Sequence, residues 1–476
     1  MIQFGTGGWR AIIGEEFTKE NIKKLIGALC LKIKAEGKTD KPVVAGYDRR
    51  FLSKEAMQWA AEELVENGID VHIVNRSSPT PMIMHYVMQK ELHYGIMITA
   101  SHNPAIFNGI KVFTYGGRDA NEECTQDIER YLPQVGDRWD DSVKGHMPPI
   151  KFTEYVEAGK ITFVNPLNQY LDSIIDCLNI QAIRNSDLRV AIDPMFGVSL
   201  ASLNTILSIA RCTIETINSE HDTLFGGKMP TPTEASLRRL QTYVLDRYCD
   251  IGVATDGDAD RLGVVDDKGR YLHANDILTI LYYYLLHYKH KLGPVVRNIA
   301  TTHRLDLLAA KYGQKCYEVP VGFKHISSKM DEVNAVIGGE SSGGLTVTGH
   351  IHGKDGIYAA SLLIEMLAVS GKKLSAIMDE IEAEFGKFYM VEDDQSFTQE
   401  HKQEIMHLLL VEKKLPAFSI PVEKVSYLDG CKVYFQNGGW VIARFSGTEP
   451  LLRVFCEMQD KTLATQICKE MKEFLQ

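Results

Sequence analysis

The feature that most constrains the fold of this chain is a repeated alternation of short apolar strands with amphipathic helical segments. Residues 41–48 (KPVVAGYD), 187–197 (DLRVAIDPMFG) and 293–302 (GPVVRNIATT) each carry a β-branched run that leads into a polar or glycine-containing turn. A helical pattern then follows, as in residues 54–67, where apolar side chains recur on one face. This alternation predicts largely parallel sheets covered by helices, and hence an α/β fold.

Four domains are predicted from this pattern. Three are similar α/β units, and the C-terminal segment, with a helix around residues 399–412 and strands near 432–436, 439–444 and 451–457, is a smaller α+β domain. Irregular stretches containing Gly, Pro or Asp are the predicted joints, at residues 132–150, 266–275 and 389–399. We therefore place the domains at residues 1–150, 151–268, 269–390 and 391–476.

Composition excludes several classes of function. The formal net charge of −10 argues against nucleic-acid binding, which needs a basic surface. No apolar run approaches the roughly 20 residues that cross a bilayer, and the N-terminal residues lack the pattern of a signal peptide. Nine scattered cysteines without a C-x-x-C pair predict neither a disulfide framework nor a zinc site. We expect a cytoplasmic protein without a nucleic-acid or membrane partner.

An acidic motif, residues 256–261 (DGDADR), lies between two apolar segments. Asp256, Asp258 and Asp260 in a tight turn suit Mg²⁺, which is commonly shared between carboxylates and a phosphate oxygen. An EF-hand calcium loop is a competing interpretation, but its position 6 is Arg261 rather than glycine and the flanks resemble strands. A solvated acidic turn without metal is a third. We favour Mg²⁺ in a phosphoryl-transfer site.

A second motif begins where an apolar strand, residues 93–100, runs into Ser101-His102-Asn103-Pro104. The segment is either an ordinary transition from strand to loop or the site of a nucleophilic serine. Open α/β sheets bind ligands at the carboxyl ends of their strands, which is where Ser101 falls. Residues 37–39 (GKT) lack the first glycine of a P-loop, so the phosphate donor need not be ATP.

Near the C-terminus, residues 444–453 (RFSGTEPLLR) combine two arginines, two hydroxyls and a glycine. Guanidinium forks and turn amides bind phosphate oxygens, so this segment is a candidate phosphate-binding loop. A hairpin with surface arginines is the alternative interpretation.

The glycine-rich segment 338–344 (GGESSGG) offers Glu340 and Ser342 to sugar hydroxyls, or forms a plain glycine turn. It also fits the G-x-S-x-G motif of serine hydrolases around Ser341. That motif requires a helix after the serine, whereas the sequence here looks extended.

These motifs together resemble the α-D-phosphohexomutase family, of the phosphoglucomutase and phosphomannomutase type. TASHNP around Ser101 with Lys111, then DGDADR, GGESSGG and RFSGTEP, occur in that family's order and approximate spacing. FGTGGWR at residues 4–10 resembles its opening motif. The resemblance implies a heart-shaped, four-domain protein, a monomer or weak homodimer, in which each domain supplies one loop to a central cleft.

The resemblance also implies an intramolecular phosphotransferase that interconverts hexose 1-phosphates and 6-phosphates. Ser101 would be phosphorylated in the resting enzyme, with Mg²⁺ held by the three aspartates and a phosphoserine oxygen. The phosphoryl group would pass to a hexose monophosphate. The resulting hexose 1,6-bisphosphate, which also serves as activator, would turn over and return its other phosphoryl group to Ser101.

Individual residues receive roles from the same resemblance. Lys111 is the expected general acid/base, while Arg10, His102 and Arg261, with Arg50 as a further candidate, would neutralise charge around the transferred group. Lys324 (in VGFK), Glu340 and Ser342 would contact the sugar. The residues expected to hold the distal phosphate are Arg444, Ser446, Gly447, Thr448 and Arg453.

The expected substrate is glucose phosphate, which the VGFK and GGESSGG segments favour over mannose or glucosamine phosphate. Two positions depart from the family pattern. Residue 344 is glycine where the branch acting on both mannose and glucose carries histidine, and residue 7 is glycine where many members have serine or aspartate. A serine hydrolase using Ser341 and a non-catalytic sugar-phosphate-binding protein are more distant alternatives.

Overall fold

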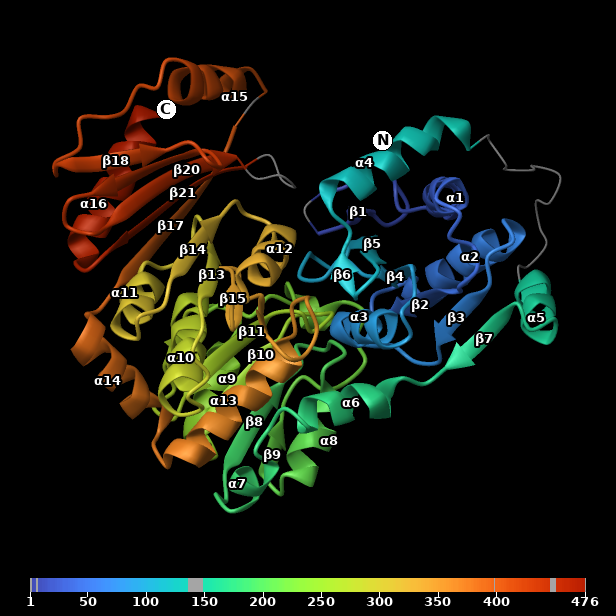
Figure 1. Ribbon diagram of the computed structural model, residues 1–476, viewed down its shortest axis with the longest axis horizontal. Coiled ribbons are helices and arrows are strands. Elements are labelled where there is room, and N and C mark those ends of the chain that lie inside the picture. Colours follow the sequence, from blue (N-terminus) through green and yellow to red (C-terminus); the bar gives the residue numbers. More distant parts are fainter. Residues whose placement is uncertain (1, 6, 136–148, 398, 446–450, 476) are drawn as a thin grey trace. The chain divides into compact units, whose positions relative to one another are not determined.

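The computed structural model describes residues 2–5, 7–135, 149–397, 399–445 and 451–475. The chain divides into two compact units, most of whose helices and strands are labelled in Figure 1. The first unit contains residues 1–274 and 343–374, and the second contains residues 275–342 and 375–476. In the described part of the chain, no helix combines the length and the apolar composition needed to cross a membrane.

A seven-stranded mixed sheet forms the N-terminal part of the first unit, with strand order β1-β5-β4-β2-β3-β7 and β6 paired to β5. β4, β2, β3 and β7 are parallel, whereas β1 and β5 are antiparallel additions. The strands are β1 (Trp9–Ile12), β2 (Val43–Tyr47), β3 (Val71–Val74), β4 (Tyr94–Ile98), β5 (Phe107–Thr114), β6 (Arg118–Asp119) and β7 (Ile161–Val164). The helices are α1 (Lys19–Ala35), α2 (Ser53–Glu66), α3 (Thr80–Gln89), α4 (Glu122–Tyr131), η1 (Leu132–Gln134) and α5 (Pro149–Glu157).

Burial accounts for the apolar runs seen in the sequence. Every residue of β4 is buried, as expected for a strand covered on both faces. The apolar faces of α1 and α2 pack into the same core, whose centre includes Leu25, Leu29 and Leu64. Thr18 begins α1 because its hydroxyl accepts a hydrogen bond from the Asn21 amide. The carboxyl ends of β2 and β4 therefore hold fixed positions for the loops that follow them.

A five-stranded sheet forms the rest of the first unit, with strand order β12-β11-β10-β8-β9. β10 and β11 form an antiparallel hairpin whose turn contains DGDADR. The strands are β8 (Arg189–Asp193), β9 (Thr213–Thr216), β10 (Ile251–Thr255), β11 (Leu262–Asp266) and β12 (Tyr271–Leu272). Other elements of this part are α6 (Leu167–Ile175), α7 (Ile180–Arg184), α8 (Leu200–Ile209), η3 (Phe225–Gly227), α9 (Arg238–Asp246), β16 (Leu345–Val347) and α13 (Gly356–Ser370).

The second unit contains the parallel strands β14, β13 and β15, hydrogen-bonded in that order. These strands are β13 (Val295–Asn298), β14 (Cys316–Val319) and β15 (Ile337–Gly339). Their helices are α11 (Arg304–Lys311) and α12 (Phe323–Val333), while α10 (Ala274–His287) and α14 (Leu374–Phe385) begin at the boundaries between the units. Ile326 and Met330 of α12 pack on Val296 of β13 in one small core.

The C-terminal domain is an antiparallel sheet with strand order β17-β21-β20-β19-β18. The strands are β17 (Tyr389–Ser396), β18 (Val422–Ser426), β19 (Cys431–Phe435), β20 (Trp440–Phe445) and β21 (Leu451–Met458). Its helices are α15 (Gln399–Met406), the π-helical η4 (His407–Val411) and α16 (Lys461–Phe474). The predicted helix and strands of this domain are therefore found within a few residues of their expected positions.

One predicted joint is wrong. Residues 389–399 were expected to be irregular, yet Tyr389–Ser396 form strand β17, which pairs with β21 along its whole length. Its acidic second half has weak intrinsic strand propensity, but tertiary pairing outweighs propensity. The Asp393 carboxylate, for example, pairs with Lys472 of α16 at 2.8 Å. The boundary that we predicted between residues 390 and 391 therefore falls inside a strand.

Candidate active site

Ser101 lies in a buried loop three residues after the end of β4. Its backbone has a left-handed φ of 52°, which is uncommon for a residue other than glycine, and its side chain is 1% exposed. Two hydrogen bonds hold the loop: the Ser101 amide donates to Thr99 Oγ1 at 2.8 Å, and Thr99 Oγ1 donates to Asp48 Oδ2 at 2.6 Å. Strained backbone of this kind is typical of functional sites.

Arg50 follows the end of β2, and its side chain binds the loop that contains Ser101, which we call the serine loop. Its two terminal nitrogens donate to four backbone carbonyls, those of Ser101 (2.7 Å), Asn103 (2.7 Å), Pro104 (2.9 Å) and Phe107 (3.0 Å). Its Nε lies 3.4 Å from Asp48 Oδ2. These contacts hold the Arg50 guanidinium against the loop that contains Ser101, and its expected part in neutralising charge at the site stays a prediction.

The three aspartates of DGDADR converge in the turn between β10 and β11, all of them buried. One ligand atom from each lies within 4.8 Å of the others. Asp256 Oδ1 accepts the amides of Asp260 and Arg261, both at 3.0 Å, which closes the turn. Antiparallel strands flank the motif, so the EF-hand alternative is excluded.

Ser101 and the acidic turn are in direct contact. Ser101 Oγ donates a hydrogen bond to Asp256 Oδ2 at 2.7 Å, and His102 Nδ1 lies 3.4 Å from the same hydroxyl. Burial, together with the neighbouring aspartates, raises the pKa of Asp256 well above its ordinary value. The structure thus brings together Ser101 and the acidic turn, which were predicted from separate motifs to be a nucleophile and a metal site.

Lys111, in the middle of β5, is buried against the same turn. Its Nζ donates to Asp258 Oδ2 at 2.6 Å and to Asp260 Oδ2 at 2.7 Å. Burial lowers the pKa of Lys111, but the two aspartates outweigh burial and raise it above the ordinary lysine value. Lys111 is therefore held as an ammonium group, able to donate a proton or neutralise charge.

Two residues that the sequence did not single out complete this cluster. Lys354 Nζ lies 3.0 Å from Asp260 Oδ2, and Thr80 Oγ1 donates to Asp258 Oδ2 at 2.6 Å. Burial favours the neutral acid, but Lys111, Lys354 and Arg261 lower the pKa of Asp260 well below its ordinary value. No local motif marks either residue, since each comes from a segment far from DGDADR in sequence.

Arg10, Arg261 and His102 surround the same site. Arg10 Nη1 donates to Asn103 Oδ1 at 2.5 Å, and burial beside Arg261 lowers the pKa of Arg10 to about 10. Burial and then Arg261 and Arg10 lower the pKa of His102 well below 6.5. In the unphosphorylated protein His102 is therefore neutral, and the positive charge comes from Arg10, Arg261 and the two lysines.

The two glycines that depart from the family pattern each lie close to a cationic side chain. A Cβ at Gly344 would lie 2.3 Å from Lys354 Cδ, so the lysine side chain fills the space that a larger residue would need. A Cβ at Gly7 would lie 2.7 Å from Arg10 Nη2. Both glycines therefore allow a cation to approach the backbone closely.

In the second unit, Glu340 is buried and joins two predicted sugar-binding segments. Its Oε1 accepts the Gly322 amide at 3.2 Å, and its Oε2 accepts the Ser342 hydroxyl at 3.4 Å. Lys324 follows Gly322 in the first turn of α12. Strand β16, not a helix, follows Ser341 in the chain, so the nucleophile elbow required of a serine hydrolase is absent at this position.

Two predicted phosphate-binding residues lie on the C-terminal sheet, where Arg444 of β20 is the register partner of Arg453 of β21. Arg444 Nε lies 3.3 Å from Asp429 Oδ2, and Arg453 Nε lies 3.7 Å from Asp394 Oδ1. The other three predicted residues, Ser446, Gly447 and Thr448, lie outside the described residues.

Comparisons with known proteins match the whole domain order. Family models of phosphoglucomutase/phosphomannomutase match alpha/beta/alpha domain I at residues 1–138, domain II at 168–269, domain III at 273–385 and the C-terminal domain at 409–474. The chain belongs to the phosphoglucomutase/phosphomannomutase family. It is therefore a mutase, an intramolecular phosphotransferase, and the predicted fold class of three α/β domains plus a smaller C-terminal domain is confirmed.

Individual relatives cover nearly all of this mutase. A phosphoglucomutase/phosphomannomutase of Thermococcus kodakarensis is 30% identical over 97% of this chain and 96% of its own length. A phosphoglucosamine/phosphogalactosamine mutase of Sulfurisphaera tokodaii is 28% identical over 99% of each chain. The crystal structure of a candidate phosphomannomutase from Thermus thermophilus superposes with a TM-score of 0.84 at 27% identity, covering 100% of this chain and 99% of that one.

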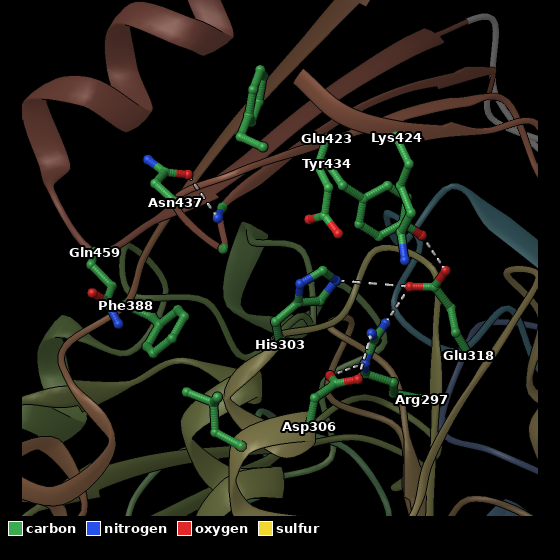
Figure 2. Close-up of a pocket in the computed structure, with 14 residues that line it drawn as sticks. Arg297, His303, Asp306, Glu318, Phe388, Glu423, Lys424, Tyr434, Asn437 and Gln459 are labelled. Carbon is green, nitrogen blue, oxygen red and sulfur yellow. Dashed lines mark hydrogen bonds and ion pairs between the residues drawn. The ribbon is translucent and has the colours of Figure 1, made fainter. Parts of the chain in front are cut away.

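A separate pocket of about 480 Å³ lies in the second unit of the mutase (Figure 2). Beside it, Glu318 Oε2 accepts Lys432 Nζ at 2.8 Å and Arg297 Nη1 at 2.5 Å. Burial alone would raise the pKa of Glu318, but His303, Arg297 and Lys432 lower it. The hairpin residues 437–439, which precede β20, line this pocket, whereas Arg444 lies near the end of that strand. Because its charges pair with one another, we interpret this cluster as part of the contact between β13–β14 and the C-terminal sheet.

Proposed function

We propose that this mutase interconverts hexose 1-phosphates and 6-phosphates through a phosphoserine at Ser101. The contact between Ser101 Oγ and Asp256 Oδ2, at 2.7 Å within a buried acidic turn, is the observation that carries the proposal. It joins a hydroxyl nucleophile to a set of oxygen ligands suited to a divalent cation. An ordinary surface serine, or an acidic turn hydrated by solvent, would be exposed, whereas Ser101 and the three aspartates are buried.

The residues present fit Mg²⁺. Asp256, Asp258 and Asp260, with an oxygen of phosphorylated Ser101, would hold it. The Oδ2 atoms of Asp258 and Asp260 accept hydrogen bonds from Lys111, while their Oδ1 atoms are buried without a hydrogen-bond partner among the described residues. These two oxygens are suited to a metal, because a buried unpaired carboxylate oxygen is costly. When bound, Mg²⁺ would offset negative charge on the phosphoryl group and orient it.

The chain's own residues supply the proton and charge steps. In the first transfer, a sugar hydroxyl oxygen forms a bond to phosphorus and the bond from phosphorus to Ser101 Oγ breaks. The sugar hydroxyl gives up its proton and Ser101 Oγ gains one, with Lys111 as the proposed general acid/base. In the second transfer, Ser101 Oγ forms a bond to the other phosphorus of the bisphosphate and the bond from that phosphorus to the sugar oxygen breaks. Ser101 Oγ loses its proton and the sugar oxygen gains one, again with Lys111 as the proposed general acid/base. Lys111, Arg10 and Arg261 stabilise the negative charge that spreads over the transferred group.

The second unit supplies the proposed substrate recognition. Lys324, Glu340 and Ser342 are the proposed sugar contacts, because Glu340 binds the turn that precedes Lys324 and also the Ser342 hydroxyl. The adjacent guanidinium groups of Arg444 and Arg453, together with Ser446, Gly447 and Thr448, are the proposed ligands of the distal phosphate.

For the sugar itself, the relatives favour glucosamine phosphate over the glucose phosphate expected from the sequence. Several carry the description "probable phosphoglucosamine mutase", including those of Methanosphaera stadtmanae and Methanothermobacter thermautotrophicus, at 29% and 28% identity over 99% of this chain. We therefore propose glucosamine phosphate as the substrate, with glucose and mannose phosphates as the alternatives. A cytoplasmic location and a monomeric or weakly dimeric state are also proposed.

A coupled assay with the 1-phosphates of glucosamine, glucose and mannose tests this proposal. We expect turnover with Mg²⁺ that is highest for glucosamine 1-phosphate, is stimulated by the matching 1,6-bisphosphate and is lost with EDTA. Binding without interconversion would contradict the proposal and indicate a sugar-phosphate-binding protein. Labelling of Ser341 by a fluorophosphonate, with activity that survives EDTA, would instead indicate a hydrolase.

A further inference from the structure

Asp429 belongs to none of the motifs considered above, but it lies beside Arg444 for a structural reason. It occupies the turn between β18 and β19, next to Gly430, whose φ is 81°. A Cβ at Gly430 would come within 2.5 Å of the Ala443 carbonyl oxygen and 2.7 Å of Arg444 Cβ. Glycine therefore lets the turn press against β20, and this approach brings Asp429 next to Arg444.

One carboxylate oxygen of Asp429 has two partners. Asp429 Oδ2 accepts the backbone amide of Val321 at 2.9 Å and lies 3.3 Å from Arg444 Nε. The side chains of Asp429 and Arg444 are 24% and 11% exposed, so this ion pair is largely shielded from solvent. A single carboxylate oxygen thus links the Arg444 guanidinium to the Val321 amide.

Val321 begins the turn that carries Lys324. The next amide, that of Gly322, donates to Glu340 Oε1 at 3.2 Å, and Gly322 has a φ of 128°, which favours glycine. Two consecutive amides are thus held by two carboxylates from different segments. Asp429 comes from the C-terminal sheet, and Glu340 comes from the GGESSGG segment.

We propose that Asp429 is a positioning residue that couples phosphate binding at Arg444 to the position of the sugar-binding turn 321–324. This inference rests on the proposed function. The terminal nitrogens of Arg444 carry no hydrogen bond to any residue that the structure describes. A phosphate can therefore bind them while Nε remains in its 3.3 Å ion pair with Asp429. Fixing the guanidinium then fixes Asp429 Oδ2, the Val321 amide and the start of the helix that presents Lys324.

A mutant cycle tests the coupling. We measure kcat/KM for the wild type, Arg444→Ala, Lys324→Ala and the double variant, and then repeat all four in an Asp429→Ala background. With Asp429 present, we expect the two substitutions to be non-additive by about 5-fold or more, as for residues in one network. Without Asp429, the same two substitutions should become additive within about 2-fold.

Two further variants separate coupling from stability. Asp429→Asn keeps an acceptor for the Val321 amide but loses the charge that attracts Arg444, so intermediate coupling is expected. Asp460→Ala is the matched control, because Asp460 caps α16 by accepting the Leu463 amide at 2.7 Å in the same domain. It should lower thermal stability and leave the coupling unchanged.

Two results would overturn the inference: additivity of Arg444→Ala and Lys324→Ala in the wild-type background, or the same non-additivity in the Asp429→Ala background. The wild type is assayed first, so that failure of the proposed function is recognised separately. If it shows no interconversion, the cycle is repeated on the affinity for glucose 1,6-bisphosphate, measured by calorimetry. Absence of binding as well would reject both the proposed function and the role of Asp429.

Discussion

Arg444 and Arg453 lie directly opposite each other on the antiparallel strands β20 and β21. Side chains in such a pair point to the same face of the sheet, and like charges placed there destabilise it. Asp429 and Asp394 offset this repulsion in part, at 3.3 Å and 3.7 Å from the two Nε atoms. A bound phosphate would offset the repulsion between the two arginines further. This supports the proposal that Arg444 and Arg453 bind the distal phosphate.

Replacing Arg453 with alanine is expected to raise KM about 10-fold and also to lower kcat. The reason is that binding of the distal phosphate by Arg453 also aligns the reacting hydroxyl. The variant should also release 1,6-bisphosphate early, so that its turnover decays and recovers when bisphosphate is added. Arg453→Lys, which keeps the charge and loses the fork, should be intermediate. Unchanged progress curves for the alanine variant would indicate that β20 and β21 form an ordinary surface hairpin that does not bind the distal phosphate.

Ser101→Ala should reduce mutase activity by about three orders of magnitude or more, since no other described hydroxyl contacts Asp256 in this way. Intact-protein mass spectrometry after incubation with bisphosphate should show a phosphoryl group on the wild type and none on the variant. Ser173→Ala is the control, because the Ser173 hydroxyl bonds only to a helix carbonyl. Near-normal turnover by Ser101→Ala would show that Ser101 is not the nucleophile.

Asp258→Asn should raise the Mg²⁺ concentration needed for half-maximal activity by roughly 10-fold, because one anionic ligand of three is lost. The amide would also face the Lys111 ammonium, which lies 2.6 Å from Asp258 Oδ2. Titration of activity with Mg²⁺ measures the effect, and Asp267→Asn in the turn after β11 is the control. A titration curve identical to the wild type would show that DGDADR does not bind the ion.

Arg50→Ala should lower kcat by about 100-fold with little change in metal affinity, since four carbonyls of the serine loop lose their charged donor. The neighbouring Arg49→Ala is the matched control, because Arg49 bonds to carbonyls of residues 196, 219 and 220 instead. Equal kinetic effects of the two substitutions would argue against a specific role for Arg50 in positioning Ser101.

Lys432 is expected to make the stability of the second unit depend on pH. Burial, and then Arg297, lower the pKa of Lys432 from 10.5 to about 7 in spite of Glu318. Between these values the unfolded state binds a proton that the folded state lacks, so this contribution to the free energy of unfolding rises with pH. It is smallest below about pH 7.

Wild type and Lys432→Met are therefore compared by thermal unfolding between about pH 6 and about pH 9. The difference in unfolding free energy should grow in favour of the wild type by up to about 1.4 kcal/mol per pH unit above pH 7. The exposed Lys469→Met is the control and should parallel the wild type. A pH-independent difference would mean that Lys432 titrates near its ordinary value.

Local sequence determined much of this protein. The runs of β-branched residues specified buried parallel strands, because such strands are covered on both faces. Ser101 and the aspartates were recognisable because each set lies within a few consecutive residues at the end of a strand. The C-terminal sheet was also predictable, except for β17, whose acidic sequence has little strand propensity and depends on its pairing with β21.

Tertiary structure decided which side chains meet. Thr80 and Lys354 reach the acidic turn from positions 178 and 94 residues away from Asp258 and Asp260 in the chain (258 − 80 and 354 − 260), and Arg50 reaches the Ser101 carbonyl across 51 residues. Asp429 reaches the Val321 amide across 108 residues. Such contacts leave no periodicity or motif in the sequence, since they depend on how strands and helices pack rather than on local conformational preference. The sequence by itself therefore determined the chemistry available, and packing determined which charges are neutralised, positioned or coupled.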